Sequence, residues 1–168
     1  LVHELCSLFS CQLYLSLILG IGNCNNNVRR KKSILSIDYG EKRIGIAISN
    51  PECSIALPSE VLERKKIIID INHIKTIIEQ KEIQAILVGM PYNMDGSESA
   101  KCKSVKDFIN NLLKIINVDI IYWDERLSTV AQEKILINNN VSRKKRKKVI
   151  DKLVASNLLQ DFLDYLKS

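Results

Sequence analysis

Apolar residues in the first third of the chain form short continuous runs that begin at Ser33. The runs SILSID and RIGIAISN have the length of strands and are joined by the short YGEK, which predicts a hairpin of two buried strands. A third short strand is predicted between Ile55 and Leu62, after turn signals at Pro51 and Pro58. The chain is therefore expected to open with three antiparallel strands.

Farther along, stretches with helical spacing alternate with continuous apolar runs. Ser97 and Ser99 are the candidate N-caps of the second helix in this series. The predicted elements, in order, are a helix over 71–78, the strand AILVG, a helix over 105–116, the strand VDIIYW and a helix over 130–136. This order predicts an α/β domain with a mixed sheet, in which the first three strands are antiparallel and the central strands are parallel.

The last helical pattern carries an acid on its apolar face. Counting forward from Asp151 at helical spacing reaches the apolar residues Ala155, Leu158, Leu159 and Phe162. In one interpretation, Asp151 caps the helix near its start or pairs with the positive end of the helix dipole. In the other, Asp151 faces a cleft and binds a metal ion together with further carboxylates.

The net charge of +6 is located in one segment, which directly precedes this pattern. Without that segment, the Lys and Arg residues equal the 19 Asp and Glu residues in number. A dense basic segment attracts polyanions, and nucleic acid is the first candidate, although a solvated basic loop without a ligand is the alternative. We call this the basic segment; it consists of Arg143, Lys144, Lys145, Arg146, Lys147 and Lys148.

Acids also end two of the predicted strands. Asp38 closes the first apolar run, and Asp124 and Glu125 follow the last one in WDER. A carboxylate at the end of a buried strand is costly unless it is paired, hydrogen-bonded or bound to a metal. The structural alternatives are an Asx-turn at Asp38 and an ion pair of the acids in WDER with Arg126.

Functional residues in such sheets gather at the carboxyl ends of the parallel strands, where these acids are expected to converge. Carboxylates that share divalent ions are what two-metal phosphoryl chemistry requires. The five cysteines form no CxxC pair and the two histidines stand alone, so the metal would be held by carboxylates. Mg²⁺, or Mn²⁺ in its place, is the expected cofactor.

The segment GMPYNMDGS leaves a predicted strand and enters a helix, which makes it a candidate phosphate loop. Its glycines permit a tight path, and Ser97 with the following amides would offer N–H groups at a helix N-terminus. The candidate substrate contacts here and beside the acids are Asn93, Gly96, Ser97, Lys42, Arg43 and Arg126.

Residues 1–32 differ in character from the rest of the chain. Their apolar run has no basic residue before it and is followed by an Asn-rich stretch over 23–27 and by RRKK, the reverse of an export signal. A poorly structured extension is preferred over a membrane anchor or export signal, with one domain over 33–168. The cysteine pattern suits a reducing compartment, so a cytoplasmic protein without stable membrane association is expected.

Four sequence blocks resemble a known family. IDYGEKRIGIAIS, VGMPYNMDGS, DERLSTVAQEKIL and VIDKLVASNLLQDFL are similar, in order and spacing, to the YqgF (RuvX-like) family. These pre-16S rRNA nucleases are related to Holliday-junction resolvases and have a ribonuclease-H-like fold. The resemblance covers 33–166. It implies that Asp38, Asp124, Glu125 and Asp151 are the catalytic acids, with Asp38, Glu125 and Asp151 as metal ligands; Asp124 in place of Glu125 is the open alternative.

The chain departs from this family at one position in the last helix, where Val154 precedes Ala155 and two alanines are usual. A bulkier side chain there is expected to shift the helix slightly.

The resemblance implies a metal-dependent endonuclease that processes the 5′ end of pre-16S rRNA, with structured RNA as its partner. Two alternatives stay open: a nuclease that resolves branched DNA with the same acids, and a non-catalytic nucleic-acid-binding factor in transcription or ribosome assembly. A phosphotransferase of the actin-like or sugar-kinase type is disfavoured, because such proteins need two domains of this kind and 168 residues supply one.

Overall fold

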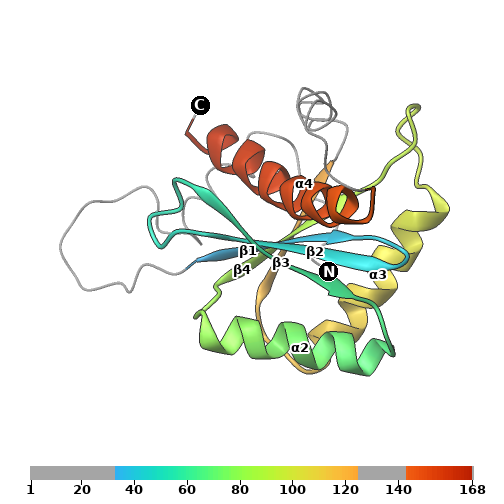
Figure 1. Ribbon diagram of the computed structural model, residues 1–168, viewed down its shortest axis with the longest axis horizontal. Helices are drawn as coiled ribbons and strands as arrows, with labels where there is room; N and C mark the ends of the chain where they lie inside the picture. Colours follow the sequence, from blue (N-terminus) through green and yellow to red (C-terminus); the bar gives the residue numbers. More distant parts are fainter. Residues whose placement is uncertain (1–32, 125–142, 168) are drawn as a thin grey trace, which may run out of the picture.

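The computed structural model describes residues 33–124 and 143–167, and in the second range it describes side chains from Leu153 onward. The described strands form one five-stranded sheet in the order β3-β2-β1-β4-β5 (Figure 1). β1 pairs antiparallel with β2 and parallel with β4, β2 pairs antiparallel with β3, and β4 pairs parallel with β5. The predicted mixed sheet is confirmed. The strands are β1 Ile34–Tyr39, β2 Arg43–Ser49, β3 Ala56–Glu63, β4 Ala85–Met90 and β5 Asp119–Asp124.

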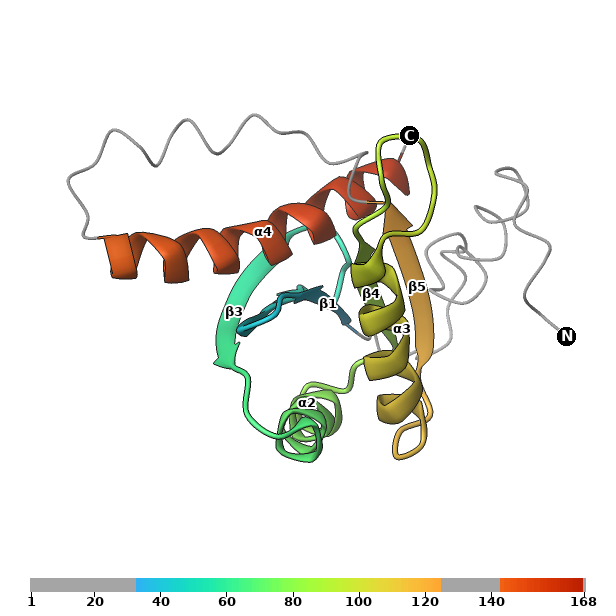
Figure 2. The ribbon, with the colours of Figure 1, turned by 90° about the vertical axis from the view of Figure 1, so that its right-hand side faces the viewer.

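Helices cover both faces of the sheet. The described helices are α2 Ile67–Gln80, α3 Ala100–Leu113 and α4 Arg143–Tyr165. Figures 1 and 2 show α2 and α3 on one face and α4 on the other. None of these helices combines the length and apolarity needed to cross a bilayer.

Two apolar clusters fill the spaces between the layers, and β1 contributes to both of them. Leu35 and Ile37 are fully buried in the cluster that the sheet forms with α2 and α3. Ile34 is buried in the cluster under α4. The Ser36 hydroxyl donates a hydrogen bond of 2.8 Å to a backbone carbonyl of α4. Because side chains alternate along a strand, Asp38 continues the α4 side.

The start of α3 agrees with one of the two predicted caps. Ser99 is the N-cap, and its hydroxyl oxygen accepts the N–H of Cys102 at 3.3 Å. Ser97 lies outside the helix. The helix predicted over 130–136 and the extension predicted over 1–32 fall outside the described residues, as do Glu125 and Arg126.

The start of α4 corrects two expectations. The helix begins at Arg143, so the basic segment is helical and the loop interpretation of it is wrong. Asp151 therefore lies two turns inside the helix, which contradicts its interpretation as an N-terminal cap. Lys and Arg are good helix formers, and no Gly or Pro separates the basic segment from the apolar stripe, so the helix extends back through it.

The apolar face predicted for the last helix is confirmed. Ala155, Leu158, Leu159 and Phe162 are all buried against the sheet. Val154 is 39% exposed, so its larger side chain lies outside this packed face and does not push the helix away.

Candidate functional site

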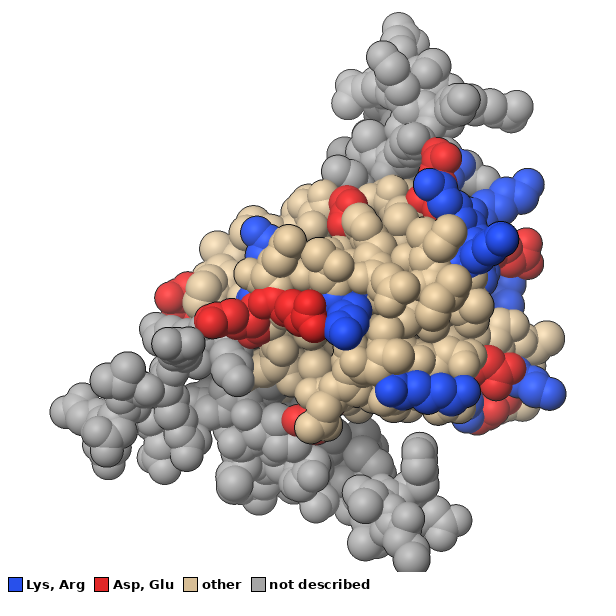
Figure 3. All heavy atoms as spheres, turned by 90° about the horizontal axis from the view of Figure 1, so that it is seen from below, with Lys and Arg blue, Asp and Glu red and all other residues tan. Residues whose placement is uncertain are grey.

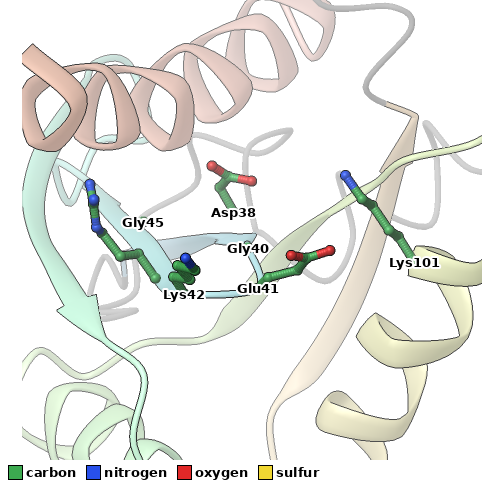
Figure 4. Close-up of a pocket in the computed structure, with 7 residues that line it drawn as sticks. Asp38, Gly40, Glu41, Lys42, Gly45 and Lys101 are labelled. Atoms are coloured by element: carbon green, nitrogen blue, oxygen red, sulfur yellow. The ribbon is translucent and has the colours of Figure 1, made fainter. Parts of the chain in front are cut away.

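A charged hollow of about 420 Å³ opens at the carboxyl end of β1 (Figure 4). It lies beside the turn from β1 to β2 and takes one further side chain from the start of α3. The residues that line it are Asp38, Gly40, Glu41, Lys42, Arg43, Gly45 and Lys101.

Asp38 reaches the hollow because of its place in β1. It pairs with Gly45 of β2, whose missing side chain leaves space beside it on the same face. Figure 4 shows the Asp38 carboxylate pointing toward α4. The predicted carboxylate at the strand end is therefore presented on the face that α4 covers.

The turn after β1 depends on Gly40. Its N–H donates to the Arg43 carbonyl at 2.9 Å, and a Cβ atom at this position would lie 2.7 Å from the same oxygen. Only glycine fits without moving the backbone. The tight turn sets Glu41 and Lys42 into the hollow, so the structure brings the two predicted cations Lys42 and Arg43 together with Asp38.

Lys101 was missed by the sequence reasoning. It is the second residue of α3, and Figure 4 shows its side chain reaching over the hollow from the α3 side. The available signal was its place in the first turn of the helix that follows the GMPYNMDGS loop. With Lys101, the hollow carries three cationic and two acidic side chains, which suits a phosphate group beside a carboxylate-held cation.

The predicted phosphate loop uses its amides internally. The N–H of Asn93 donates to the Ser97 carbonyl at 3.0 Å, and the N–H of Gly96 donates to the Asn93 carbonyl at 2.9 Å. The Ser97 N–H and hydroxyl both donate to Asp95 Oδ1, at 2.9 and 2.6 Å. The Ser97 N–H is thus already bonded to Asp95, and phosphate binding by this loop stays a prediction.

Asp124 lies on the opposite face of the sheet from Asp38. It pairs in register with Met90, which is buried in the cluster under α2 and α3, whereas its neighbour Trp123 packs under α4. Burial raises the pKa of the Tyr92 phenol on this side, and the charge of Asp124 adds to the rise. Asp124 is therefore not among the residues that line the hollow, and its catalytic role stays a prediction.

The direction of α4 determines which of its residues approach the end of β1. Gln160 Oε1 accepts the N–H of Ala56, at the start of β3, at 2.9 Å. The start of β3 lies at the same end of the sheet as the start of β1, because both strands are antiparallel to β2. The turns of α4 that precede Gln160 therefore extend toward the carboxyl end of β1.

Asp38 and Asp151 both lie close to one contact between β1 and α4. The Ser36 hydroxyl donates to the Ala155 carbonyl. Asp38 follows Ser36 by two strand residues, an advance of about 7 Å, and Asp151 precedes Ala155 by one helical turn, about 6 Å. From this contact Asp38 lies farther along β1, and Asp151 lies toward the start of α4, which crosses the sheet toward β3 (Figure 2).

Among the residues that the structure describes, no three potential metal-ligating side chains form a group. Glu125 and the side chain of Asp151 are outside the part that the structure describes, so this statement does not extend to them. The backbone of the basic segment belongs to the first turns of α4, and Figure 2 shows this end of the helix projecting past β3.

Comparisons with known proteins agree with this architecture. The model of the RuvX family, described as Holliday junction resolvase, matches residues 32–165. A protein of Ruegeria sp. (strain TM1040) named "Putative pre-16S rRNA nuclease" is 44% identical over 135 residues, which cover 80% of this chain and 86% of the relative. A protein of Halothermothrix orenii with the same name is 48% identical over 132 residues, which cover 79% of this chain and 94% of the relative.

The structure of T. thermophilus RuvC in complex with a Holliday junction substrate resembles this one in fold. The TM-score is 0.55 at 10% identity, and the match covers 80% of this chain and 96% of that chain. This likeness confirms the predicted ribonuclease-H-like fold. With a family model that spans the sheet and the described helices, and with close relatives in that family, the chain belongs to the RuvX family.

Proposed function

We propose that this protein is a divalent-metal-dependent endonuclease that cleaves structured RNA, and that its substrate is the 5′ end of pre-16S rRNA. The observation that carries this proposal is the placement of the Asp38 carboxylate in one hollow with Lys42, Arg43 and Lys101. The names of its relatives support the choice of substrate.

Asp38, Glu125 and Asp151 would hold Mg²⁺ or Mn²⁺. The hollow fits a hard cation, because its ionisable lining consists of carboxylates and cationic side chains and contains no Cys or His. A bound divalent ion would supply a Lewis acid at the phosphoryl oxygens and lower the pKa of a bound water. The position of Asp151 one turn before Ala155 supports its place in this set.

Glu125 is the better candidate ligand of the two acids in WDER. Asp124 shares the face of Met90, away from the α4 side that Asp38 faces. Glu125, the adjacent acid, is therefore our proposed ligand from this pair.

The cationic side chains of the hollow would bind and orient the substrate. Lys42 belongs to the turn, Arg43 begins β2, and Lys101 approaches from α3 (Figure 4), so a phosphate in the hollow would be contacted from two sides. The basic segment would hold the polynucleotide backbone farther along α4, without reading its sequence.

The domain division and the cellular location belong to the same proposal. We infer a nuclease domain over 33–168 preceded by an extension over 1–32, and a cytoplasmic protein. The family match over residues 32–165 supports this division.

Asp38→Asn tests the function directly. The variant is expected to lose at least about 100-fold in cleavage rate in Mg²⁺, because the amide removes a metal-binding charge. RNA binding is expected to remain or to tighten, because a negative charge has been removed from the site. Asp119→Asn is the matched control and should cleave like the wild type, because Asp119 begins β5, at the end of the strand away from the hollow.

The substrate decides between the remaining candidates. A pre-rRNA mimic and a four-way DNA junction are incubated at identical Mg²⁺ and salt concentrations, because basic tracts bind both polymers non-specifically. Preferred cleavage of the junction would favour the DNA resolvase, an alternative supported by the description of the family. Unchanged biological activity of Asp38→Asn would instead identify a non-catalytic binding factor.

A further inference from the structure

Arg64, the residue after β3, contacts the turn that lines the hollow although it does not line the hollow itself. Its backbone N–H donates to the Lys42 carbonyl at 3.0 Å. Its Nη1 atom donates to the Gly40 carbonyl at 3.2 Å and to the Glu41 carbonyl at 3.3 Å. One arginine thus bonds to three consecutive carbonyls of the turn.

The Arg64 guanidinium faces a buried acid on the α2 side of the sheet, although its Nε makes no hydrogen bond. Its Nε lies 3.9 Å from Asp70 Oδ2, and the Asp70 side chain is fully buried. The N–H of Lys65 fixes the same carboxylate through a hydrogen bond of 3.1 Å to Oδ1. The guanidinium also lies 4.4 Å from the ring centroid of Tyr39, whose ring packs 4.7 Å from that of Phe108.

These contacts link the turn to the core. Asp70 belongs to the first turn of α2, and Phe108 belongs to α3. The hydrogen bonds from the Arg64 side chain to the turn, which we call the clamp, are therefore connected to both helices of that face. The side chain of Arg64 is 24% exposed, and this partial shielding from water strengthens its hydrogen bonds to the carbonyls.

We propose that Arg64 is a positioning residue, which holds the turn from Gly40 to Lys42 so that Asp38, Lys42 and Arg43 keep the relative placement that cleavage requires. This inference rests on the proposed nuclease function. Small displacements of reacting groups cost large factors in rate, so a loosened turn is expected to slow the chemical step more than it weakens binding.

Arginine is suited to this role by its shape. Its planar guanidinium carries several N–H donors at fixed angles, which lets it bond to two carbonyls, face a carboxylate and lie against a ring at once. Lysine would keep the charge beside Asp70 but not this geometry. Arg64→Lys therefore separates the geometry of the clamp from its charge.

The experiment compares Arg64→Lys and Arg64→Gln with the wild type. Amide hydrogen exchange of the peptide that spans residues 39–43 is expected to become about tenfold faster, because each turn bond opens more often, while exchange in β4 stays unchanged. The kcat for RNA cleavage is expected to fall at least about tenfold, with KM within about twofold. Lys75→Gln, which removes an exposed charge paired with Glu79, is the control and should change neither measurement.

Each outcome decides the inference. Unchanged exchange in the turn overturns it, whatever happens to cleavage. Faster exchange in the turn with unchanged kcat also overturns it, because the clamp would then hold a turn that catalysis does not need. Faster exchange throughout the sheet assigns Arg64 a general structural role and overturns it as well.

A wild-type protein that cleaves neither RNA nor DNA would remove the proposed function itself, and the exchange data would still show whether Arg64 holds the turn. If Arg64→Gln fails to fold, Asp70→Asn gives a second route to the same readouts. This variant removes the negative charge beside Arg64 while keeping the guanidinium. Faster amide exchange confined to the turn and a lower kcat are expected again.

Discussion

Single steps along a strand decide which acids share a site in this protein. Asp38 points to the α4 side of the sheet, and its neighbour Tyr39 packs against Phe108 on the other side. At the end of β5 the acid and the aromatic residue exchange faces: Trp123 lies under α4, and Asp124 lies on the opposite face. Two acids that both end a strand therefore face different environments.

This difference predicts unequal effects of two neighbouring substitutions. Asp124→Asn is expected to keep cleavage within about threefold of the wild type, because its carboxylate lies away from the hollow. Glu125→Gln is expected to lose at least about 100-fold, as for Asp38→Asn, because it would remove a metal ligand.

Single-turnover cleavage at saturating Mg²⁺ measures both effects, and the two variants are isosteric amide replacements of adjacent acids, so each controls for the other. A large loss from Asp124→Asn together with a small one from Glu125→Gln would reverse our assignment of the metal ligand.

At the scale of elements, α4 combines two functions along its length. Its later turns pack on the sheet through Ala155, Leu159 and Phe162, and the Phe162 ring meets Trp123 edge to face with centroids 5.3 Å apart. Its first turns carry the basic segment past β3 (Figure 2). The packed turns therefore determine how the basic turns are presented.

The packing of α4 can be tested through the single tryptophan of the chain. Phe162→Ala is expected to lower the free energy of unfolding by about 3–5 kcal/mol, because Phe162 is fully buried and its removal leaves a cavity. Urea unfolding followed by Trp123 fluorescence measures this loss, since the ring of Trp123 contacts the site of the substitution.

The matched control on the same helix is Val154→Ala. Val154 is 39% exposed, and alanine is the better helix former, so the change in unfolding free energy is expected to stay within about 0.5 kcal/mol. If both substitutions cost the same, the face of α4 assigned to the core would be incorrect.

At the scale of the whole molecule, charge is distributed unevenly. Figure 3 shows that much of the surface on the side that carries α2 is uncharged, with one group of acidic and basic side chains near its middle and further charged side chains toward its edges. Three exposed isoleucines, Ile67, Ile68 and Ile69, begin α2 on this side. The basic segment belongs to α4 on the other face of the sheet, so a polyanion is expected to approach along α4.

This arrangement predicts how salt affects binding. Replacing Lys144, Lys145, Lys147 and Lys148 together by Gln is expected to weaken RNA and DNA binding alike and to reduce the slope of log K against log salt by about 0.7–0.9 for each lost phosphate contact. Fluorescence anisotropy over a salt series measures the slope.

Lys65→Gln with Lys66→Gln, just before α2, forms the control pair and should leave the slope unchanged. A slope that is also unchanged in the fourfold variant would place the polyanion-binding surface elsewhere.

Much of the architecture follows from local patterns. The apolar runs and helical spacings predicted the order of β1 to β5 and the helices between them, because burial imposes a period on the sequence of each element. The strand-end position of Asp38 and the cations of the YGEKR turn were also apparent, because a hairpin places adjacent residues together. The four sequence blocks, in their order and spacing, also identified the family.

Other features were decided by tertiary structure alone. The face of Asp124 was hidden because apolar residues follow one another directly in IIYW, so this run shows no alternation from which a face could be read. The start of α4 was missed because charged residues lack the apolar period, although their propensity for helix is high.

The sequence by itself determined the family, the layers and the acid at the end of β1, because each of these rests on residues close together in the chain or on one element's period. Only the tertiary structure brought Lys101 across to that acid and Arg64 beneath the turn. Both contacts join segments far apart in the sequence, and their geometry depends on how whole elements pack.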